Sequence, residues 1–326
     1  ILFKNKSLSS IKWQKLSVGN DNNNINWERV NPNKDSSNEI KFNKKKKLTS
    51  HHSNYKINSL NRSIVIGEQI VGPDISWLVP PGFKWTNTHK LDASIRGYNQ
   101  TLTHRRKSDE GWGWNKGDAV GQFYYQFFTK DKYTIGTNIG MRSVNSASLD
   151  GYTPIGDGLS AGFRFDYQLS NSSGFAVGAE QLLHFDGVTD TGRDLYITAS
   201  KAFWRDNLEG KFPLKVATGG IATGRLAEGT IKGLCSNLFG GAGTEVSKQR
   251  RLCWAPVFSL SYLFNKKLST FFEYNSRFFL LGTSLIPFER VPLRGTFALT
   301  IADHIHNYKL NNLDEMTWTF RLSLGY

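Results

Sequence analysis

The sequence predicts an all-β chain, an antiparallel, up-and-down β-barrel of about twelve strands that crosses a membrane and follows a disordered N-terminal tail. Three observations predict it. Residues 316–326 alternate without error between large apolar residues at even positions and polar or small residues at odd positions, which is the strand period. Comparable segments recur from residue 92 onward, and about ten to twelve residues suffice for a tilted strand to cross a bilayer. Their connections alternate between short turns and long loops.

The composition supports a barrel and excludes a helical membrane protein. Hydrophobic residues make up 39% of the 326 residues and aromatic residues 13%. The sequence has no run of about 18 apolar residues, the length that a transmembrane helix needs. Alternating lipid-facing strands produce this balance, because half of each strand stays polar. An ordinary soluble, aromatic-rich β protein remains the alternative at this point.

The N-terminal 62 residues differ from the rest of the chain. Residues 1–62 are rich in Asn, Lys and Ser and hold 13 Lys/Arg against 4 Asp/Glu, so most of the formal net charge of +14 lies there. Sparse, aperiodic apolar residues predict a disordered basic tail. Residues 63–91 include the proline-broken aromatic stretch 77–85 and form either a linker or a partial plug of the barrel. No Lys/Arg stripe follows the aromatic region, so nucleic acid is not an expected partner.

The barrel is expected over residues 92–326. The predicted strands are 92–103, 117–128, 133–144, 158–170, 174–185, 194–204, 213–223, 254–264, 268–276, 277–288, 291–303 and 316–326.

The strand count depends on one turn. Taking 268–281 as a single strand gives eleven strands and puts a tight turn among the long loops. A break near Asn275 and Ser276, a plausible tight turn, restores the alternation and gives twelve. The segment 92–103 alternates poorly, so ten strands is the alternative.

The region 92–326 resembles bacterial outer-membrane β-barrels, and its part 268–303 resembles hairpins of cyanobacterial and related barrels. The hairpin series 117–144 and 158–185 and the last strand carry this resemblance. In that strand the bulky residues at every second position, ending on an aromatic, are similar to the signal that the outer-membrane assembly machinery reads: Trp318, Phe320, Leu322, Leu324 and Tyr326. The resemblance implies the outer membrane of a Gram-negative-type bacterium, and it identifies no single family.

Once the apolar phase is assigned to lipid, the other phase faces the lumen, because a charge at the bilayer midplane costs a few kcal/mol. The lumen-lining candidates are Asn138, Arg142, Arg164, Asp166, Glu180, His184, Glu273 and Arg321. These residues fit two interpretations equally well. They are either a network of paired charges filling a narrow barrel, or the lining of a polar pore whose arginines favour anions.

The loops suggest partners outside the barrel. The basic runs 104–107 and 248–251 would meet the phosphates of lipopolysaccharide, but ordinary solvated loop charge is the simpler explanation of both. Cys235 and Cys253 lie in one loop and form either a disulfide or two free thiols. Their spacing is not that of a metal site.

Catalysis is not expected. Asp303 and His304 lack a nearby nucleophile, and Asp186, Asp190 and Asp194 lack the fixed spacing of a calcium loop. No cofactor is expected.

The sequence therefore predicts an outer-membrane polar pore for a small polar solute or a structural barrel of the cell surface. A barrel enzyme acting on lipid or polysaccharide is the first alternative, and a soluble ligand-binding β protein the second.

Overall fold

The computed structural model divides into two compact units, residues 1–52 and 53–326. The described residues are 13–15, 27–29, 64–85, 90–99, 118–141, 158–185, 193–227, 234–236, 252–276, 278–288, 291–303 and 317–325. In the first unit, β1 (Trp13–Lys15) and β2 (Trp27–Arg29) pair antiparallel within the predicted disordered tail. The other residues of the predicted tail lie outside the described residues.

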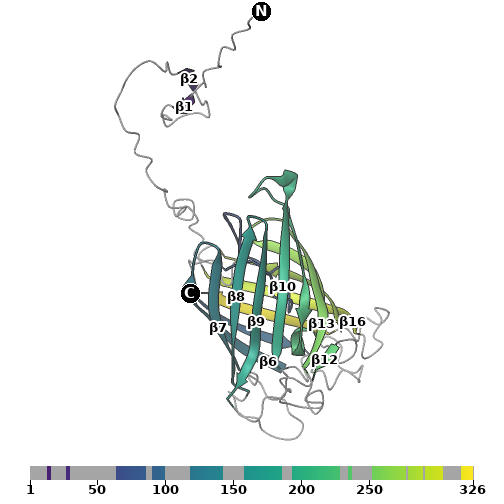
Figure 1. Cartoon of the computed structure of the whole chain (residues 1–326). Coiled ribbons are helices and arrows are strands. Elements are labelled where there is room, and N and C mark those ends of the chain that lie inside the picture. Colours follow the sequence, from purple (N-terminus) through teal and green to yellow (C-terminus); the bar gives the residue numbers. More distant parts are fainter. Residues whose placement is uncertain are drawn as a thin grey trace, which may run out of the picture. The chain divides into compact units, whose positions relative to one another are not determined.

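In the second unit, twelve of the described strands close into an antiparallel barrel (Figure 1). These strands are β5 (Leu91–Tyr98), β6 (Asp118–Thr129), β7 (Tyr133–Met141), β8 (Ser160–Ser170), β9 (Ser173–His184), β10 (Asp194–Trp204), β11 (Leu214–Ala222), β13 (Leu252–Leu263), β14 (Leu268–Tyr274), β15 (Phe278–Leu285), β16 (Leu293–Asp303) and β17 (Trp318–Gly325).

Two pairings complete the barrel. The first and last barrel strands pair along their length, from Gly325 opposite Asp92 to Thr319 opposite Tyr98. β11 pairs with β13, while the short β12 (Leu234–Ser236) extends the ladder beyond β13. Closure leaves no free edge among the twelve strands, so their backbone polar groups are paired as a membrane-spanning sheet requires.

The predicted twelve-stranded barrel is confirmed, including its least certain elements. The segment with poor alternation forms β5, so the ten-strand alternative is wrong. The break near Asn275 also exists: β14 ends at Tyr274, and Ser276 has a φ of 69° at the turn. Some strands are shorter than expected, β14 having 7 residues and β5, β15 and β17 having 8 each.

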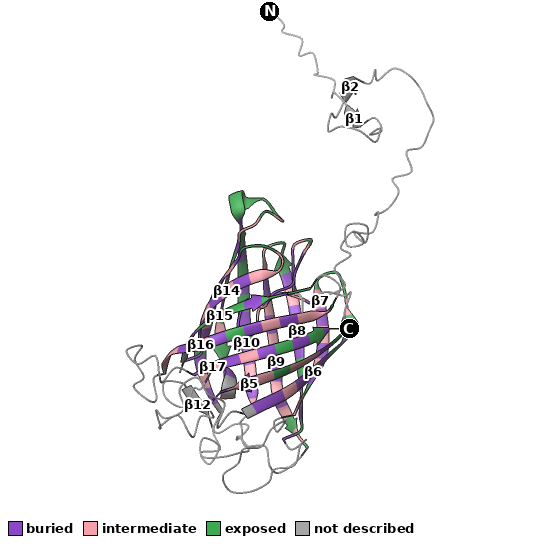
Figure 2. Cartoon of the chain, turned by 180° about the vertical axis from the view of Figure 1, so that it is seen from behind, coloured by how far each residue is buried: buried purple, intermediate pink, exposed green. Residues whose placement is uncertain are grey.

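The two faces of the wall are inverted relative to a soluble protein. Along β8, Ser160, Arg164 and Asp166 are buried, whereas Phe163 and Leu169 are exposed. The same alternation is visible around the barrel as bands of buried and exposed residues (Figure 2). A polar inner face and an apolar outer face are the pattern of a transmembrane barrel. Within the described residues, no helix combines the length and apolar character needed to span a bilayer.

A segment from before the barrel fills part of its lumen. Residues 64–85, here called the lumen segment, begin with a hairpin of β3 (Ile64–Ile66) and β4 (Gln69–Val71). The chain then runs irregularly to Trp85, which bridges back to Ile64. Most side chains of this segment are buried, and its partners lie on strands from β5 to β17. The segment that the sequence predicted as a linker or a partial plug thus contacts the inner wall of the barrel.

Candidate functional site

The base of the lumen segment is held by apolar packing. Ile66, Val71, Phe83 and Trp85 belong to one buried cluster with inward side chains of the wall. The wall contributes Tyr124, Ala202, Trp204, Leu214, Val216 and Leu263. Trp204, Leu214 and Leu263 lie at strand ends beside short turns, so this cluster marks the short-turn end of the lumen. Burial of each large apolar side chain contributes about 1.5–3 kcal/mol, which fixes the base firmly.

The tip of the segment, residues 72–82, is held mainly through its backbone. Glu273 of β14 accepts hydrogen bonds from the backbone N–H groups of Trp77 and Leu78, at 2.6 and 2.8 Å. The Thr198 hydroxyl of β10 donates to the Pro80 carbonyl at 2.7 Å. Gly82 N–H donates to Ser200 Oγ, also at 2.7 Å. Irregular backbone away from water needs such partners, and here the strand side chains provide them.

A chain of ionic contacts ties the tip to the seam where the barrel closes. Asp74 of the lumen segment contacts Arg294 of β16 at 3.1 Å and Arg321 of β17 at 2.6 Å. Arg294 also reaches Asp92 of β5 at 3.8 Å. Burial raises the pKa of Asp74, but the two arginines and the hydrogen bonds from Thr296 and Arg321 outweigh burial and lower it to about 2. The carboxylate is therefore charged across the physiological pH range.

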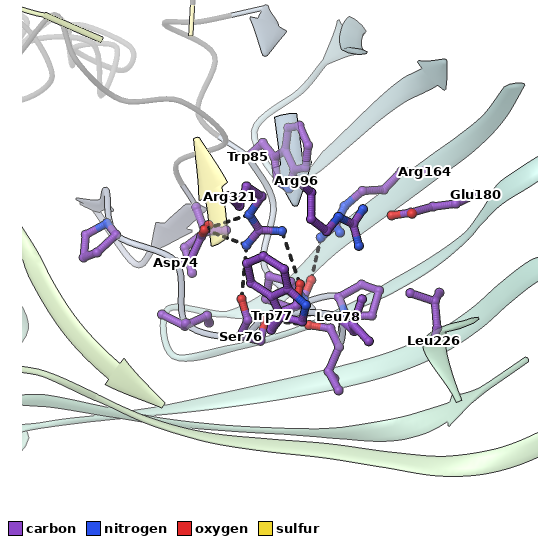
Figure 3. Close-up of a pocket in the computed structure, with 16 residues that line it drawn as sticks. Asp74, Ser76, Trp77, Leu78, Trp85, Arg96, Arg164, Glu180, Leu226 and Arg321 are labelled. Carbon is purple, nitrogen blue, oxygen red and sulfur yellow. Dashed lines mark hydrogen bonds and ion pairs between the residues drawn. The ribbon is translucent and has the colours of Figure 1, made fainter. Parts of the chain in front are cut away.

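Trp77 contacts two arginines at this seam, Arg321 and Arg96 (Figure 3). Arg321 and Arg96 are directly opposite each other on β17 and β5, an arrangement in which like charges repel. The guanidinium carbons lie 5.0 and 5.9 Å from the Trp77 ring centroid, within the range of cation–π attraction. Arg321 also donates to the carbonyls of Ser76 and Trp77, both at 3.2 Å. The tip thus stabilises a pair of like charges in the wall.

A second ionic group lies on β8. Arg164 contacts Asp166 at 2.5 Å, and both side chains are buried. Thr134 of β7 donates to Asp166 at 3.0 Å. Arg164 also donates to the Pro81 carbonyl at 2.5 Å and lies 5.1 Å from the Trp85 ring centroid. This pair therefore joins the wall to the far side of the tip.

Two small cavities remain beside the tip. One, of about 60 Å³, is lined by the tip together with Arg96, Arg164, Glu180 and Arg321. The other, of about 30 Å³, lies against β5–β10. Leu78, Arg96, Glu180 and Leu226 line both cavities and separate them. Each cavity has room for a few waters at most, so the tip and these four side chains narrow the lumen here.

The residues expected to line the lumen fall into three groups. Asn138, Arg164, Asp166, Glu273 and Arg321 are buried, and all but Asn138 bond to the lumen segment or to a residue that does. Glu180 lines both cavities, and His184 is half-buried opposite Ser160. Arg142 lies outside the described residues.

The expected assembly-signal residues occupy the outer face of β17. Trp318 and Phe320 are partly exposed, and Leu322 and Leu324 are about half exposed at 45% and 50%. Tyr326 lies outside the described residues, as do the basic runs 104–107 and 248–251, Asp186, Asp190, His304 and His306.

Sequence reasoning did not propose several charged residues of the lumen. These are Asp74, Asp92, Arg96, Asp194 and Arg294. Arg294 and Asp194 lie in phase with the polar positions of predicted strands. The phase of alternation could therefore have identified both as facing the lumen. Asp74 lies on no strand, and Asp92 and Arg96 lie where alternation is poor.

The two cysteines lie opposite each other on β12 and β13. Cys253 is disulfide-bonded, and Cys235 is the one other cysteine of the chain. Within the described part of the chain, no group of three or more metal-ligating side chains is present.

The fold and the lumen define the class of this protein as a closed transmembrane-type β-barrel with an internal segment of its own chain. No protein-family model and no curated protein matches the sequence.

Proposed function

We propose that this protein is an outer-membrane barrel of a Gram-negative-type bacterium and acts as a polar conduit that the lumen segment keeps closed. The apolar outer face and polar inner face support a membrane location, and the short turns support an orientation with that end toward the periplasm. The lumen segment and the two small cavities support the closed state.

The observation that carries the conduit proposal is the way in which the tip is held. Glu273, Arg321, Thr198 and Ser200 bond to the tip's backbone. Water can replace these hydrogen bonds, whose net value is about 0.5–1.5 kcal/mol each for the neutral Thr198 and Ser200 and about 1.5–3 kcal/mol each for the ionisable Glu273 and Arg321. The apolar base has no comparable substitute. If the tip withdrew while the base stayed fixed, a polar passage would open. A purely structural barrel would not need polar wall side chains that bind the tip through replaceable hydrogen bonds.

The charges of the lumen bear on the solute. Among the described charged residues of the lumen are four arginines, Arg96, Arg164, Arg294 and Arg321, and six carboxyl groups, those of Asp74, Asp92, Asp166, Glu180, Asp194 and Glu273. Because these carboxyl groups outnumber the arginines, we propose a conduit for small polar solutes that does not prefer anions.

A structural barrel of the cell surface is the second candidate. The filled interior favours it, because an apolar base and several ionic contacts stabilise the closed wall without any passage. The two candidates differ in what happens when the tip is loosened.

Planar-bilayer conductance separates them. Thr198→Val with Ser200→Ala removes two hydrogen bonds to the tip with little change in volume, and should raise the open probability by about tenfold or more at roughly 0.5–1.5 kcal/mol per bond. Thr283→Val, on the outer face of β15, is the matched control and should leave conductance unchanged. A folded, inserted barrel that conducts in neither form would support the structural candidate. Recovery of folded protein without detergent would contradict both.

A further inference from the structure

Two lysines interrupt the apolar outer face near the short-turn end. Lys201 of β10 and Lys215 of β11 are exposed and point outward, in phase with Phe203 and Ile221. A lysine facing lipid costs about 2–4 kcal/mol at the bilayer midplane and close to nothing at its boundary. The Lys201 ammonium donates to Ser172 of the β8–β9 turn at 2.8 Å, which places this group at the boundary.

The sheet register arranges the outer wall around these lysines in two rows. The row nearest the short turns contains Phe203, Lys215, Tyr262, Thr270 and Thr283. The next row contains Lys201, Ala217, Leu260, Phe272 and Leu281. Lys201 and Lys215 are therefore diagonal neighbours, a separation of about 7–8 Å between their Cα atoms. The first row is polar and cationic, and the second is mostly apolar.

A groove of about 430 Å³ follows these rows across β10–β15. Its outward lining includes Phe203, Lys215, Leu260, Phe272 and Leu281. Small residues deepen the wall here. Ala217 forms part of the groove, and Gly219, next along the outer face of β11, is exposed with no atom within 4 Å of where a Cβ would lie. The groove is thus apolar along its length and cationic at its short-turn end.

We propose that this groove binds one anionic phospholipid, with an acyl chain along Ala217 and Leu260 and the headgroup phosphate on Lys215, which lines the groove, beside its diagonal neighbour Lys201. Lys215 makes no ion pair within the described residues, and the carboxylate of Asp206 in the adjacent turn is taken by Lys211 at 2.6 Å. A lysine close to an anionic membrane surface contributes about 1 kcal/mol of attraction. The site needs only a bilayer and does not depend on whether the barrel conducts.

A second copy of the chain fits this groove less well. Outward positions with described side chains on the twelve strands carry no carboxylate, so a symmetric contact would bring lysines against lysines. A phospholipid supplies the missing negative charge and a flexible apolar chain together.

Native mass spectrometry of the purified full-length barrel in detergent micelles tests the site. Phosphatidylglycerol and phosphatidylcholine with identical acyl chains are titrated separately. The wild type should retain one phosphatidylglycerol at least about tenfold more tightly than phosphatidylcholine. The double variant Lys201→Gln with Lys215→Gln should abolish this difference, because each lysine is expected to raise the affinity for phosphatidylglycerol about fivefold. Ala217→Phe, which fills the groove, should weaken retention of both lipids.

Matched controls are Lys132→Gln, an exposed lysine of another short turn, and Ile139→Phe, on the outer face of β7. Both should bind as the wild type does, and heat-dependent gel mobility checks that every variant is folded. Equal retention of the two lipids by the wild type would overturn the proposal. Loss of selectivity in Lys132→Gln to the same extent as in the double variant would also overturn it, and so would a dimer that excludes lipid.

Discussion

The carboxylate of Glu273 lies 2.6 Å from the backbone nitrogen of Trp77, although 196 positions separate the two residues in the chain. Glu273→Gln should loosen the tip, because an amide offers one acceptor oxygen where two N–H groups now find two. We expect a loss of about 1–3 kcal/mol in the free energy of opening the tip. In a background without Cys235 and Cys253, the thiol of Val79→Cys should then react about tenfold faster with a small reagent. Asp206→Asn, in an exposed turn, is the control and should leave the labelling rate unchanged. An unchanged rate in Glu273→Gln would contradict the role of Glu273 in holding the tip.

Acid should release Asp74 before it unfolds the wall. Its pKa is about 2 instead of 3.8, so its contribution to stability is complete above about pH 4 and disappears as the pH falls toward 2. The shift corresponds to a contribution on the order of 2 kcal/mol. In denaturant titrations in lipid vesicles, the stability difference between the wild type and Asp74→Asn should stay constant between pH 7 and 5 and shrink below pH 4. Asp74→Asn should be less stable at pH 7 and decline less steeply. Parallel pH profiles for the two proteins would rule out this role.

The outer face should reject charge. Ile197 is 47% exposed on β10, two wall rows farther from the short turns than Lys201, and Ile197→Arg should destabilise the barrel in lipid vesicles by about 2–4 kcal/mol. Ile197→Ala is the control for lost packing and should cost less. A soluble barrel would gain solubility from the arginine, so an unchanged or higher stability would argue against lipid contact at this position.

The orientation can be tested on intact cells. Lys132 is exposed and Lys267 is partly exposed in two short turns, which the proposed topology directs toward the periplasm. Lys132→Cys and Lys267→Cys, in a background without the native cysteines, should be protected from an impermeant thiol reagent until the outer membrane is permeabilised. Ser247→Cys, in the segment 224–253 that the sequence predicts to be external, should react without permeabilisation. The reverse pattern would invert the topology.

The wall of the barrel was predictable because its signal is local. Period-two alternation identified the strands, and the order of short and long connections located the turn at Asn275 before any pairing was known. The phase of alternation then put Arg164, Asp166, Glu273 and Arg321 on one face. Alternation was weakest along β5, because small residues interrupt its outer, apolar face. The inner positions of β5, which include Asp92 and Arg96, were therefore hard to assign.

The seat of the lumen segment was not predictable from local patterns. Trp77 and Leu78 gain their partner from β14, and Asp74 gains its partners from β16 and β17, more than 190 residues away. Leu214 and Leu263 depart from the polar character of the inner face, and only the presence of Ile66 and Phe83 explains this. A single sequence contains no sign that an apolar residue at an inner position packs against a segment from before the barrel.

The N-terminal part of the second unit contacts the last strands twice. β5 pairs with β17, and the lumen segment contacts β14, β16 and β17. Residues 64–85 are synthesised before any wall strand, yet Glu273, Arg294 and Arg321 belong to the last four strands. In an unfinished barrel the backbone groups of the tip therefore lack these partners. The tip gains its hydrogen bonds and ionic contacts only after the last strands have joined the barrel. Contacts this distant in sequence slow folding, because the chain must close large loops before it gains from them. We therefore expect substitutions that disrupt the final strands to loosen residues 74–78 before the rest of the lumen segment.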